Sequence, residues 1–364
     1  MKIGIDARFY GIHHTGIGRY VQNLIISLGK KDKQNDYIIF GPKEILPDIA
    51  TYSNFHLVEL TTKPYTIAEQ IINSVVFLKA DLDLLHVPHF YAPILYPKKL
   101  VITIHDLIKH YSTGRETTTL PPLIYFLKHI LYKIIIFINI HKAVAIITPT
   151  NYWKEILVKS YSIDSSKINV TYEAAAFRHP LSKPVDLTQY DLSKPYLIYT
   201  GNLYPHKNVN FLIQAIKQFN LQHEHHLQLA VISARDAFTN KLKQNDVVKL
   251  LGFIPDEEIP SLYSQAIALV QPSLIEGFGL TGLEAMDLGL PVLSSNTSCL
   301  PEVYANAALY FNPKDQADLI SRLDLIVHHP EIREELIKQG LVRVKHFSWY
   351  KMAKDTLVVY KKCV

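Results

Sequence analysis

The stretch KIGIDARFYGIHHTGIGRYVQNL, residues 2–24, combines a short apolar strand, a polar turn and the start of a helix. Its first five residues form a buried-strand pattern, and the segment YVQNLIISLGK (20–30) repeats apolar residues at helical spacing. Gly16 and Gly18 lie immediately before this predicted helix. A strand, turn and helix in this order is the unit from which helix-covered parallel sheets are built. The stretch therefore predicts a doubly wound α/β fold.

The same alternation of strand and helix patterns recurs in two series. Strand patterns of the first series continue at 37–40, 55–60, 84–87, 100–104 and 143–148, and those of the second lie at 196–201, 227–233, 247–252, 266–273, 291–296 and 308–311. Between the series, residues 177–195 are irregular and contain three prolines. A chain of 364 residues is also longer than a domain with a single hydrophobic core usually is. We therefore expect two Rossmann-like domains joined by one linker.

Composition and charge narrow the class of protein. The chain is 48% hydrophobic and 20% charged, which is typical of a folded protein. With only two cysteines, Cys299 and Cys363, we expect no disulfide framework. Asp6 and Arg8 interrupt any signal-like apolar segment at the start. We therefore expect a cytoplasmic protein. Residues 1–180 carry 20 Lys and Arg against 14 Asp and Glu, which favours a polyanionic neighbour, either nucleic acid or an anionic membrane.

The most apolar segment is LIYFLKHILYKIIIFINIHKAVAIIT, residues 123–148. Lys128, Lys133 and Lys142 interrupt it, so it lacks the ~20 uninterrupted apolar residues of a membrane span. Two interpretations stay open: a buried helix leading into a strand, or a basic amphipathic face that touches lipid headgroups. We favour the buried helix.

Two turns at the ends of strands could bind phosphate. Gly16 and Gly18 at a strand-to-helix turn would let a phosphate approach backbone N–H groups, although the third glycine of the dinucleotide-binding fingerprint is absent. In the second series, the strand at 196–201 is followed by Lys207 and then by another helix. At the carboxyl edge of a parallel sheet, where such folds bind ligands, this lysine could neutralise a departing diphosphate.

The stretch SLIEGFGLTGLEAMDLGLPV, residues 273–292, contains two carboxylates. Thr281 and Glu284 have the spacing of a capping box, which would explain Glu284 as the start of a helix. Glu276 stands in the loop after a strand, where a carboxylate can hold the hydroxyl groups of a polar ligand. The backbone amides of residues 278–281 can point toward the same edge. In the first series, His105 likewise follows a strand at its carboxyl end.

At these residues the sequence resembles the retaining glycosyltransferases of family 4, which have the GT-B fold of two facing Rossmann-like domains with a cleft between them. The resemblance covers nearly the whole chain and is carried by an ordered set of motifs: TGIGRYVQNL (15–24), VITIHDL (101–107), IITPTNYWKEIL (146–157), YTGNLYPHKN (199–208), PSLIEGFGLTGLEAM (272–286) and FSWYKMAKDTLVVY (347–360). It implies an acceptor-side domain at 1–178, a nucleotide-sugar domain at 179–346, and a closing helix at 347–364 that crosses back to the first domain.

The resemblance also implies roles for individual residues. Lys207 would bind the donor's diphosphate, Glu276 the sugar hydroxyls, and Glu284 the ribose. The amides at Gly279, Leu280 and Thr281, beside Phe278, would meet the sugar or phosphate. From the first domain, Gly16 and Gly18 would close over the diphosphate, and His105 would sit near the acceptor hydroxyl. His105, Lys207 and Glu276 are the expected catalytic residues.

One position departs from the family pattern. Many members carry arginine directly after the glycine of the lysine turn, and this chain has Asn202 there. An amide stabilises a leaving dianion less than a guanidinium group does. Arg8, Arg19 or His206 could compensate for it.

The expected activity is transfer of a hexose to a saccharide or lipid-linked saccharide with retained configuration, and the favoured hexose is mannose from GDP-mannose. We expect no cofactor and no metal: DLD (81–83) precedes a buried strand, and QHEHH (222–226) is interpreted as a solvated loop. The partners would be the sugar donor, the acceptor and an anionic membrane at the inner face of the cell, without nucleic acid. A sugar-nucleotide epimerase on the same fold and a non-catalytic sugar-nucleotide-binding subunit of a polysaccharide assembly complex are the alternatives.

Overall fold

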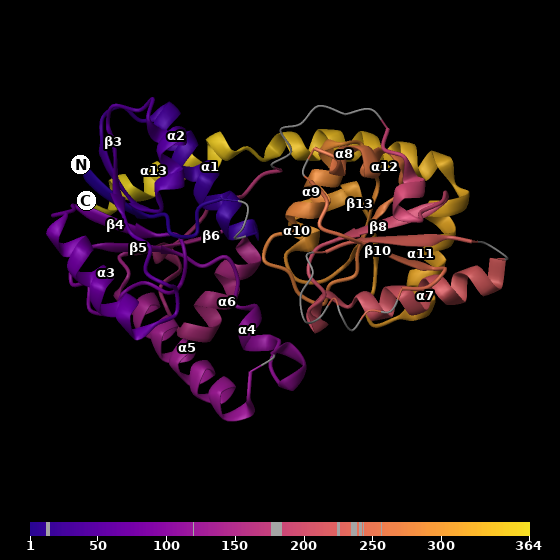
Figure 1. Ribbon diagram of the computed structural model, residues 1–364, viewed down its shortest axis with the longest axis horizontal. Coiled ribbons are helices and arrows are strands. Elements are labelled where there is room, and N and C mark those ends of the chain that lie inside the picture. Colours follow the sequence, from indigo (N-terminus) through magenta and orange to yellow (C-terminus); the bar gives the residue numbers. More distant parts are fainter. Residues whose placement is uncertain are drawn as a thin grey trace. The chain divides into compact units, whose positions relative to one another are not determined.

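The computed structural model describes residues 1–11, 15–118, 120–175, 184–223, 226–233, 239, 242, 244–255 and 257–364. The chain forms two compact units (Figure 1). Unit 1 comprises Met1–Leu107, Leu120–Glu173 and Phe347–Val364, and unit 2 comprises Ile108–Thr119 and Ala174–His346. The sequence-predicted boundary between residues 178 and 179 falls outside the described residues.

Unit 1 contains a seven-stranded parallel sheet in the order β3-β2-β1-β4-β5-β6-β7. The strands are β1 Lys2–Asp6, β2 Asp36–Gly41, β3 Phe55–Glu59, β4 Leu84–Val87, β5 Leu100–Thr103, β6 Ala145–Thr148 and β7 Ile168–Val170. The first six strands match the predicted apolar runs. The seventh is only three residues long and only partly buried, so it lacks the apolar run that would have predicted it.

The helices of unit 1 connect and cover these strands. They are α1 Thr15–Lys31, α2 Leu46–Ile49, α3 Ile67–Lys79, α5 Pro122–Lys142, α6 Asn151–Tyr161 and the C-terminal α13 Trp349–Cys363. Side-chain caps start several of them: Thr66 accepts a hydrogen bond from the Glu69 amide in α3, and Ser348 accepts one from the Lys351 amide in α13. Buried residues of α13, Tyr360 among them, belong to the same core as α1 and β1.

Unit 2 contains a six-stranded parallel sheet in the order β10-β9-β8-β11-β12-β13. The strands are β8 Tyr196–Thr200, β9 Gln228–Ile232, β10 Val248–Gly252, β11 Leu269–Gln271, β12 Val292–Ser295 and β13 Ala308–Phe311, and the helices are α4 Ile108–Tyr111, α7 Val209–His223, α8 Ile259–Gln265, α9 Leu280–Asp287, α10 Leu300–Tyr304, α11 Gln316–His328 and α12 Pro330–Arg343. All six predicted strands of the second series are present.

Both sheets are apolar on their two faces. Consecutive strand residues, which point to opposite faces, are buried alike, as for Val101 and Ile102 in unit 1 and Leu197 and Ile198 in unit 2. Helices on both faces exclude water from these strands, which explains why they appear in the sequence as continuous apolar runs rather than alternating ones. Two Rossmann-like parallel-sheet units are therefore present, as the alternating pattern predicts.

Helix α5 differs from the favoured interpretation of its sequence. Its buried residues are Ile135, Ile136, Asn139 and Ile140, all in its C-terminal half. Most of the other apolar residues of the helix are exposed, with Leu123 70% exposed. The prediction of a buried helix is therefore wrong for most of α5, because the residues that are buried against unit 1 all lie in its C-terminal half.

Candidate active site

Lys207 and Glu276 are brought together at the carboxyl edge of the unit 2 sheet. Lys207 ends the short 3-10 helix Pro205–Lys207 after β8, and the left-handed backbone of Asn208 turns the chain into α7. Glu276 lies in the loop between β11 and α9. Because β8 and β11 are neighbouring parallel strands, the loops that follow them meet at one edge. The two residues that the sequence placed at separate strand ends therefore share one site.

The two side chains form a mostly buried ion pair. The Lys207 ammonium donates to Glu276 Oε1 at 2.7 Å and to Oε2 at 2.8 Å, and the Ser273 hydroxyl donates to Oε1 at 2.6 Å. The exposed fractions of the Lys207 and Glu276 side chains are 16% and 9%. Burial alone would raise the pKa of Glu276, but the charge and hydrogen bonds of Lys207 outweigh burial and lower it. Glu276 is therefore ionised at neutral pH.

This ion pair leaves one N–H donor of Lys207 available for a ligand. An ammonium group carries three N–H donors, and two of the Lys207 donors go to Glu276. The third can bond an anionic oxygen without breaking the pair. Glu276 lies beside that position, and a ligand hydroxyl can bond it by replacing one of its present donors. The arrangement can therefore hold a phosphate beside a carboxylate that accepts a hydroxyl.

The start of α9 differs from the predicted capping box. The helix begins at Leu280 and its N-cap is Gly279, which has φ 100° and makes no side-chain cap hydrogen bond. The Tyr304 hydroxyl donates to the Gly279 carbonyl at 2.6 Å and occupies the space beside it. Because the helix already begins at Leu280, Thr281 lies inside it and Glu284 cannot cap it. The capping-box prediction is wrong.

The early start of α9 puts the predicted backbone donors in its first turn. The N–H groups of Leu280 and Thr281 have no acceptor within the helix, as in the first turn of any α-helix. Glu284 lies in mid-helix and is 3% exposed, and Phe278 is 4% exposed. The expected roles of Phe278, Gly279, Leu280, Thr281 and Glu284 toward a donor stay predictions.

Gly16 and Gly18 lie inside the first turn of α1, not before the helix as predicted. A Cβ atom on Gly18 would come within 1.9 Å of the Gly11 carbonyl oxygen and 2.9 Å of the Phe9 carbonyl oxygen. Close backbone approach therefore requires glycine at position 18 whether or not a ligand binds. The expected contact of these two glycines with a diphosphate stays a prediction.

His105 follows β5 in unit 1 and is held from both sides of its ring. Nδ1 lies 2.9 Å from Glu173 Oε1, and Nε2 lies 3.2 Å from the Pro88 carbonyl oxygen. Both partners are acceptors, so both ring nitrogens must donate, which only the protonated imidazolium can do. Burial lowers the pKa of His105, but the hydrogen bond and charge of Glu173 outweigh it and raise the pKa above its ordinary value. The surroundings of His105 therefore favour its protonated form, and its expected place near the acceptor hydroxyl stays a prediction.

We expect Glu173→Gln to lower the pKa of His105, because the neutral amide removes the attraction that opposes burial. In the native chain the raised pKa of His105 stabilises the fold. This contribution is complete at a pH below the pKa of the ring in the unfolded chain, about 6.5, and it is lost as the pH rises through the higher pKa of the folded chain. Titration of the His105 ring by NMR measures the change. His86 is the control, because burial lowers its pKa to about 3 and it should stay neutral near pH 7 in both proteins. An unchanged His105 pKa would contradict the account.

Two of the residues proposed to compensate for Asn202 do not supply a spare cation. Arg8 is buried in unit 1 and pairs with Asp6 at 2.6 Å and with Glu69 at 2.7 Å, so carboxylates already neutralise it. Burial, together with the charge of Lys207, lowers the pKa of His206 to about 4, so this ring is neutral near pH 7. Asn202 is exposed in the loop after β8. Within the described loop that follows β8, Lys207 is thus the charged group.

His206 offers a polar atom beside the ion pair. Its Nδ1 atom is buried and has no hydrogen-bond partner within the described part of the chain. A buried polar atom without a partner is costly, and such atoms occur where a ligand or water completes the site. Sequence reasoning named His206 only as a substitute cation. Ser273, Glu173 and Tyr304, which hold Glu276, His105 and Gly279, were missed because no local motif signals contacts between distant segments.

The two motifs considered for metal binding have different surroundings. Asp81 pairs with Lys98 at 2.5 Å, and the Asp83 carboxylate accepts the Lys2 amide at 2.7 Å. From QHEHH, His223 lies near Asp324 and His328, with all potential ligand atoms within 4.8 Å, the one such group in the described chain. His223 lies at the C-terminal end of α7, about 20 Å along that helix from Lys207.

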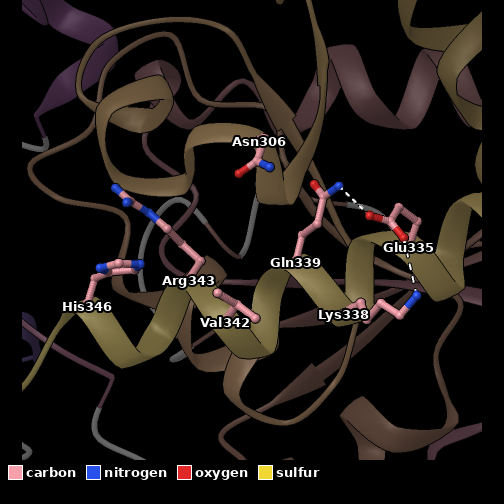
Figure 2. Close-up of a pocket in the computed structure, with 7 residues that line it drawn as sticks. All are labelled: Asn306, Glu335, Lys338, Gln339, Val342, Arg343 and His346. Atoms are coloured by element: carbon pink, nitrogen blue, oxygen red, sulfur yellow. Dashed lines mark hydrogen bonds and ion pairs between the residues drawn. The ribbon is translucent and has the colours of Figure 1, made fainter.

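A concavity of about 300 Å³ lies elsewhere on unit 2, along the C-terminal half of α12 (Figure 2). Arg343, one of its lining residues, donates at 2.7 Å to each of the carbonyls of Glu302 and Val303 near the end of α10. Glu335 bonds Gln339 at 2.7 Å. None of the lining residues is a predicted site residue, and their hydrogen bonds explain them as packing of α12 on unit 2.

Comparison with known sequences finds two family models. The one described as Glycosyltransferase Family 4 matches residues 14–174, and the one described as Glycosyl transferases group 1 matches residues 188–343. Among similar curated proteins, O-antigen chain mannosyltransferase B of Escherichia coli is 27% identical over 293 residues, which are 76% of this chain and 73% of that protein. O-antigen chain mannosyltransferase RfbU of Salmonella typhimurium is 29% identical over 245 residues, 64% of this chain and 66% of that protein.

Solved structures show the same architecture. HepE of Anabaena, in complex with UDP and glucose, superposes with a TM-score of 0.74 at 14% identity, over 100% of both chains. At this identity the likeness shows the fold alone. The predicted α/β class, GT-B with two Rossmann-like domains, is confirmed.

Proposed function

This chain belongs to the group 1 glycosyltransferases of family 4, and on that premise we propose that it transfers a mannosyl residue from a nucleotide-diphosphate sugar to a glycan or lipid-linked saccharide. The choice of mannose is supported by the two similar O-antigen chain mannosyltransferases. A sugar-nucleotide donor is supported by the similar fold of HepE, which was solved with UDP and glucose. GDP-mannose is the donor we propose.

The observation that carries the proposal is the Lys207–Glu276 pair at the carboxyl edge of the unit 2 sheet. A mostly buried cation beside a carboxylate suits a ligand that joins a phosphate to a hydroxylated ring. In the proposed complex the free donor of Lys207 bonds a diphosphate oxygen, and Glu276 accepts a sugar hydroxyl. Ser273 keeps the carboxylate oriented.

The proposed reaction is a front-face substitution. The bond between the sugar's anomeric carbon and the diphosphate breaks, and the acceptor oxygen bonds that carbon from the same face, so the configuration is retained. The acceptor's proton passes to the departing phosphate oxygen. Negative charge that develops on the diphosphate is met by Lys207 and by the first-turn amides of α9, which are already in place before the reaction.

Charge neutralisation by Lys207 and backbone amides gives the proposed reaction no step that needs a divalent cation. We therefore propose that transfer is metal-independent and continues in the presence of EDTA. The proposed setting is the cytoplasm, at the inner face of the membrane where a lipid-linked saccharide is available. The two free cysteines suit a reducing compartment.

The test is product analysis with a panel of nucleotide sugars and membrane lipid extracts. We expect mass spectrometry to show one added hexose from GDP-mannose, with EDTA present, and NMR of the product to show the donor's anomeric configuration. With the donor alone, NMR should show no interconversion of sugars. Conversion of the donor without acceptor would favour an epimerase, and inverted configuration would contradict the front-face reaction.

A further inference from the structure

Helix α5 presents an apolar stripe to solvent. Leu123, Leu127, Ile130, Ile134 and Phe137 are spaced four and three residues apart, which places them on one face of the helix. They are between 39% and 70% exposed. Soluble proteins rarely leave such a continuous apolar surface in water, so we expect a binding partner to cover this stripe.

The helix lies on the surface of unit 1 and is held there by its other face. Asn139 Nδ2 donates to the Phe90 carbonyl at 3.0 Å and to the Ala92 carbonyl at 2.9 Å, and Lys142 Nζ donates to the Ile94 carbonyl at 2.7 Å. Residues Pro122–Lys142 are long and apolar enough to cross a bilayer by length and composition. Because its C-terminal half is packed and bonded in unit 1, α5 is suited to lie along a surface instead.

Helix α3 extends the apolar surface. Ile67 is 80% exposed, and Ile71, Ile72, Val75 and Leu78 are also exposed. The Gln70 side chain of α3 accepts the Ile94 amide at 2.9 Å, so one loop is bonded to both helices. Leu95 in that loop is 63% exposed. Figure 1 shows α3 and α5 along the same side of unit 1. We call the exposed apolar residues of α3, α5 and Leu95 the docking face.

The charges around the docking face are positive. Helix α5 contains no Asp or Glu. At about 100° per residue, the exposed Lys133 borders the apolar stripe on one side, and the exposed Lys128 lies farther round the helix on the other side. In α3, Lys79 is exposed, whereas the only carboxylate, Glu69, is buried and paired with Arg8. Asp81, which follows α3, pairs with Lys98. An apolar stripe flanked by lysines is the pattern of a helix that lies in the lipid interface.

We propose that the docking face binds the surface of an anionic lipid bilayer, with α5 lying in the plane of the headgroups. Apolar side chains would enter the acyl boundary, and Lys128 and Lys133 would reach the lipid phosphates. A second copy of the chain fits less well, because it would bring the same lysines against each other. The proposal rests on α3 and α5 alone and does not depend on the sugar-transfer activity.

The test is co-sedimentation of the full chain with phosphatidylglycerol or phosphatidylcholine vesicles. The variant Leu127→Gln with Ile130→Gln and Ile134→Gln should bind phosphatidylglycerol vesicles about a hundredfold more weakly than the native chain. Lys128→Gln with Lys133→Gln should weaken binding to phosphatidylglycerol about thirtyfold and leave phosphatidylcholine binding nearly unchanged. High salt should have the same effect as the lysine variant.

The matched control changes three exposed apolar residues of unit 2, Leu221→Gln with Leu341→Gln and Val342→Gln, and should bind like the native chain. Unchanged thermal unfolding of each variant shows that the fold is retained. If the native chain binds neither vesicle, or if the α5 variant binds as well as the control, the proposal is overturned. It is also overturned if sedimentation velocity shows a dimer that the α5 variant abolishes while vesicle binding is absent.

Discussion

Replacing Lys207 with methionine should lower kcat/KM for sugar transfer by about a hundredfold or more. In the proposed reaction the ammonium group meets the charge that develops on the leaving diphosphate, and removal of one such preplaced donor typically costs about 10²–10³ in rate. Within the described loop after β8, Lys207 is the charged group, since Asn202 is neutral and burial keeps His206 neutral near pH 7. Steady-state kinetics with GDP-mannose measures the loss.

The same substitution should also destabilise unit 2, and a second variant separates the two effects. Without Lys207, the buried Glu276 carboxylate has no cation, which costs about 3 kcal/mol for a buried pair. Lys207→Met combined with Glu276→Gln removes both charges and should restore the free energy of unfolding to near the native value. Transfer should stay low. Recovery of transfer in the double variant would mean that Lys207 serves only the fold.

Gly18→Ala should destabilise unit 1 by about 3 kcal/mol or more. The added Cβ would stand 1.9 Å from the Gly11 carbonyl oxygen, and that contact is with backbone, which cannot rotate away. The loop after β1 or the first turn of α1 must then move, and severe overpacking of this kind lies at the upper end of single-residue effects. Chemical denaturation measures the change.

Gly340→Ala is the matched control for this prediction. Gly340 is also within a helix, α12, but its new Cβ would meet Met286 Cγ at 3.0 Å and Met286 Cβ at 3.1 Å, contacts that a shift of a few tenths of an ångström relieves. Alanine favours the helix over glycine by about 1 kcal/mol, so we expect a neutral or slightly stabilising change. If both variants have the same stability, the close approach at Gly18 is not what requires glycine there.

Much of the fold could be predicted because its strands are buried on both faces. Such strands appear in the sequence as continuous apolar runs. Helical patterns between them, such as the 13 residues Ile67–Lys79, indicate that the strands run parallel. The convergence of Lys207 and Glu276 could be predicted from the same rule, because parallel strands end at one edge of a sheet. These inferences use only local pattern and one general property of the fold.

Contacts between distant segments could not be predicted. The Glu173 carboxylate that keeps His105 protonated is 68 residues away in the chain, and Tyr304, which fixes the turn at Gly279, is 25 residues away. The exposure of α5 was missed for a related reason. Its apolar sequence fits a buried helix equally well, and only the packing around it decides which face has neighbours.

The central claim is that Lys207 binds the donor's diphosphate, and calorimetric titration with GDP and UDP tests it most directly. The native chain should bind the nucleoside diphosphate of its donor, and the Lys207→Met, Glu276→Gln variant should bind it at least about tenfold more weakly while keeping the native free energy of unfolding. An equal Kd in both proteins would contradict the account.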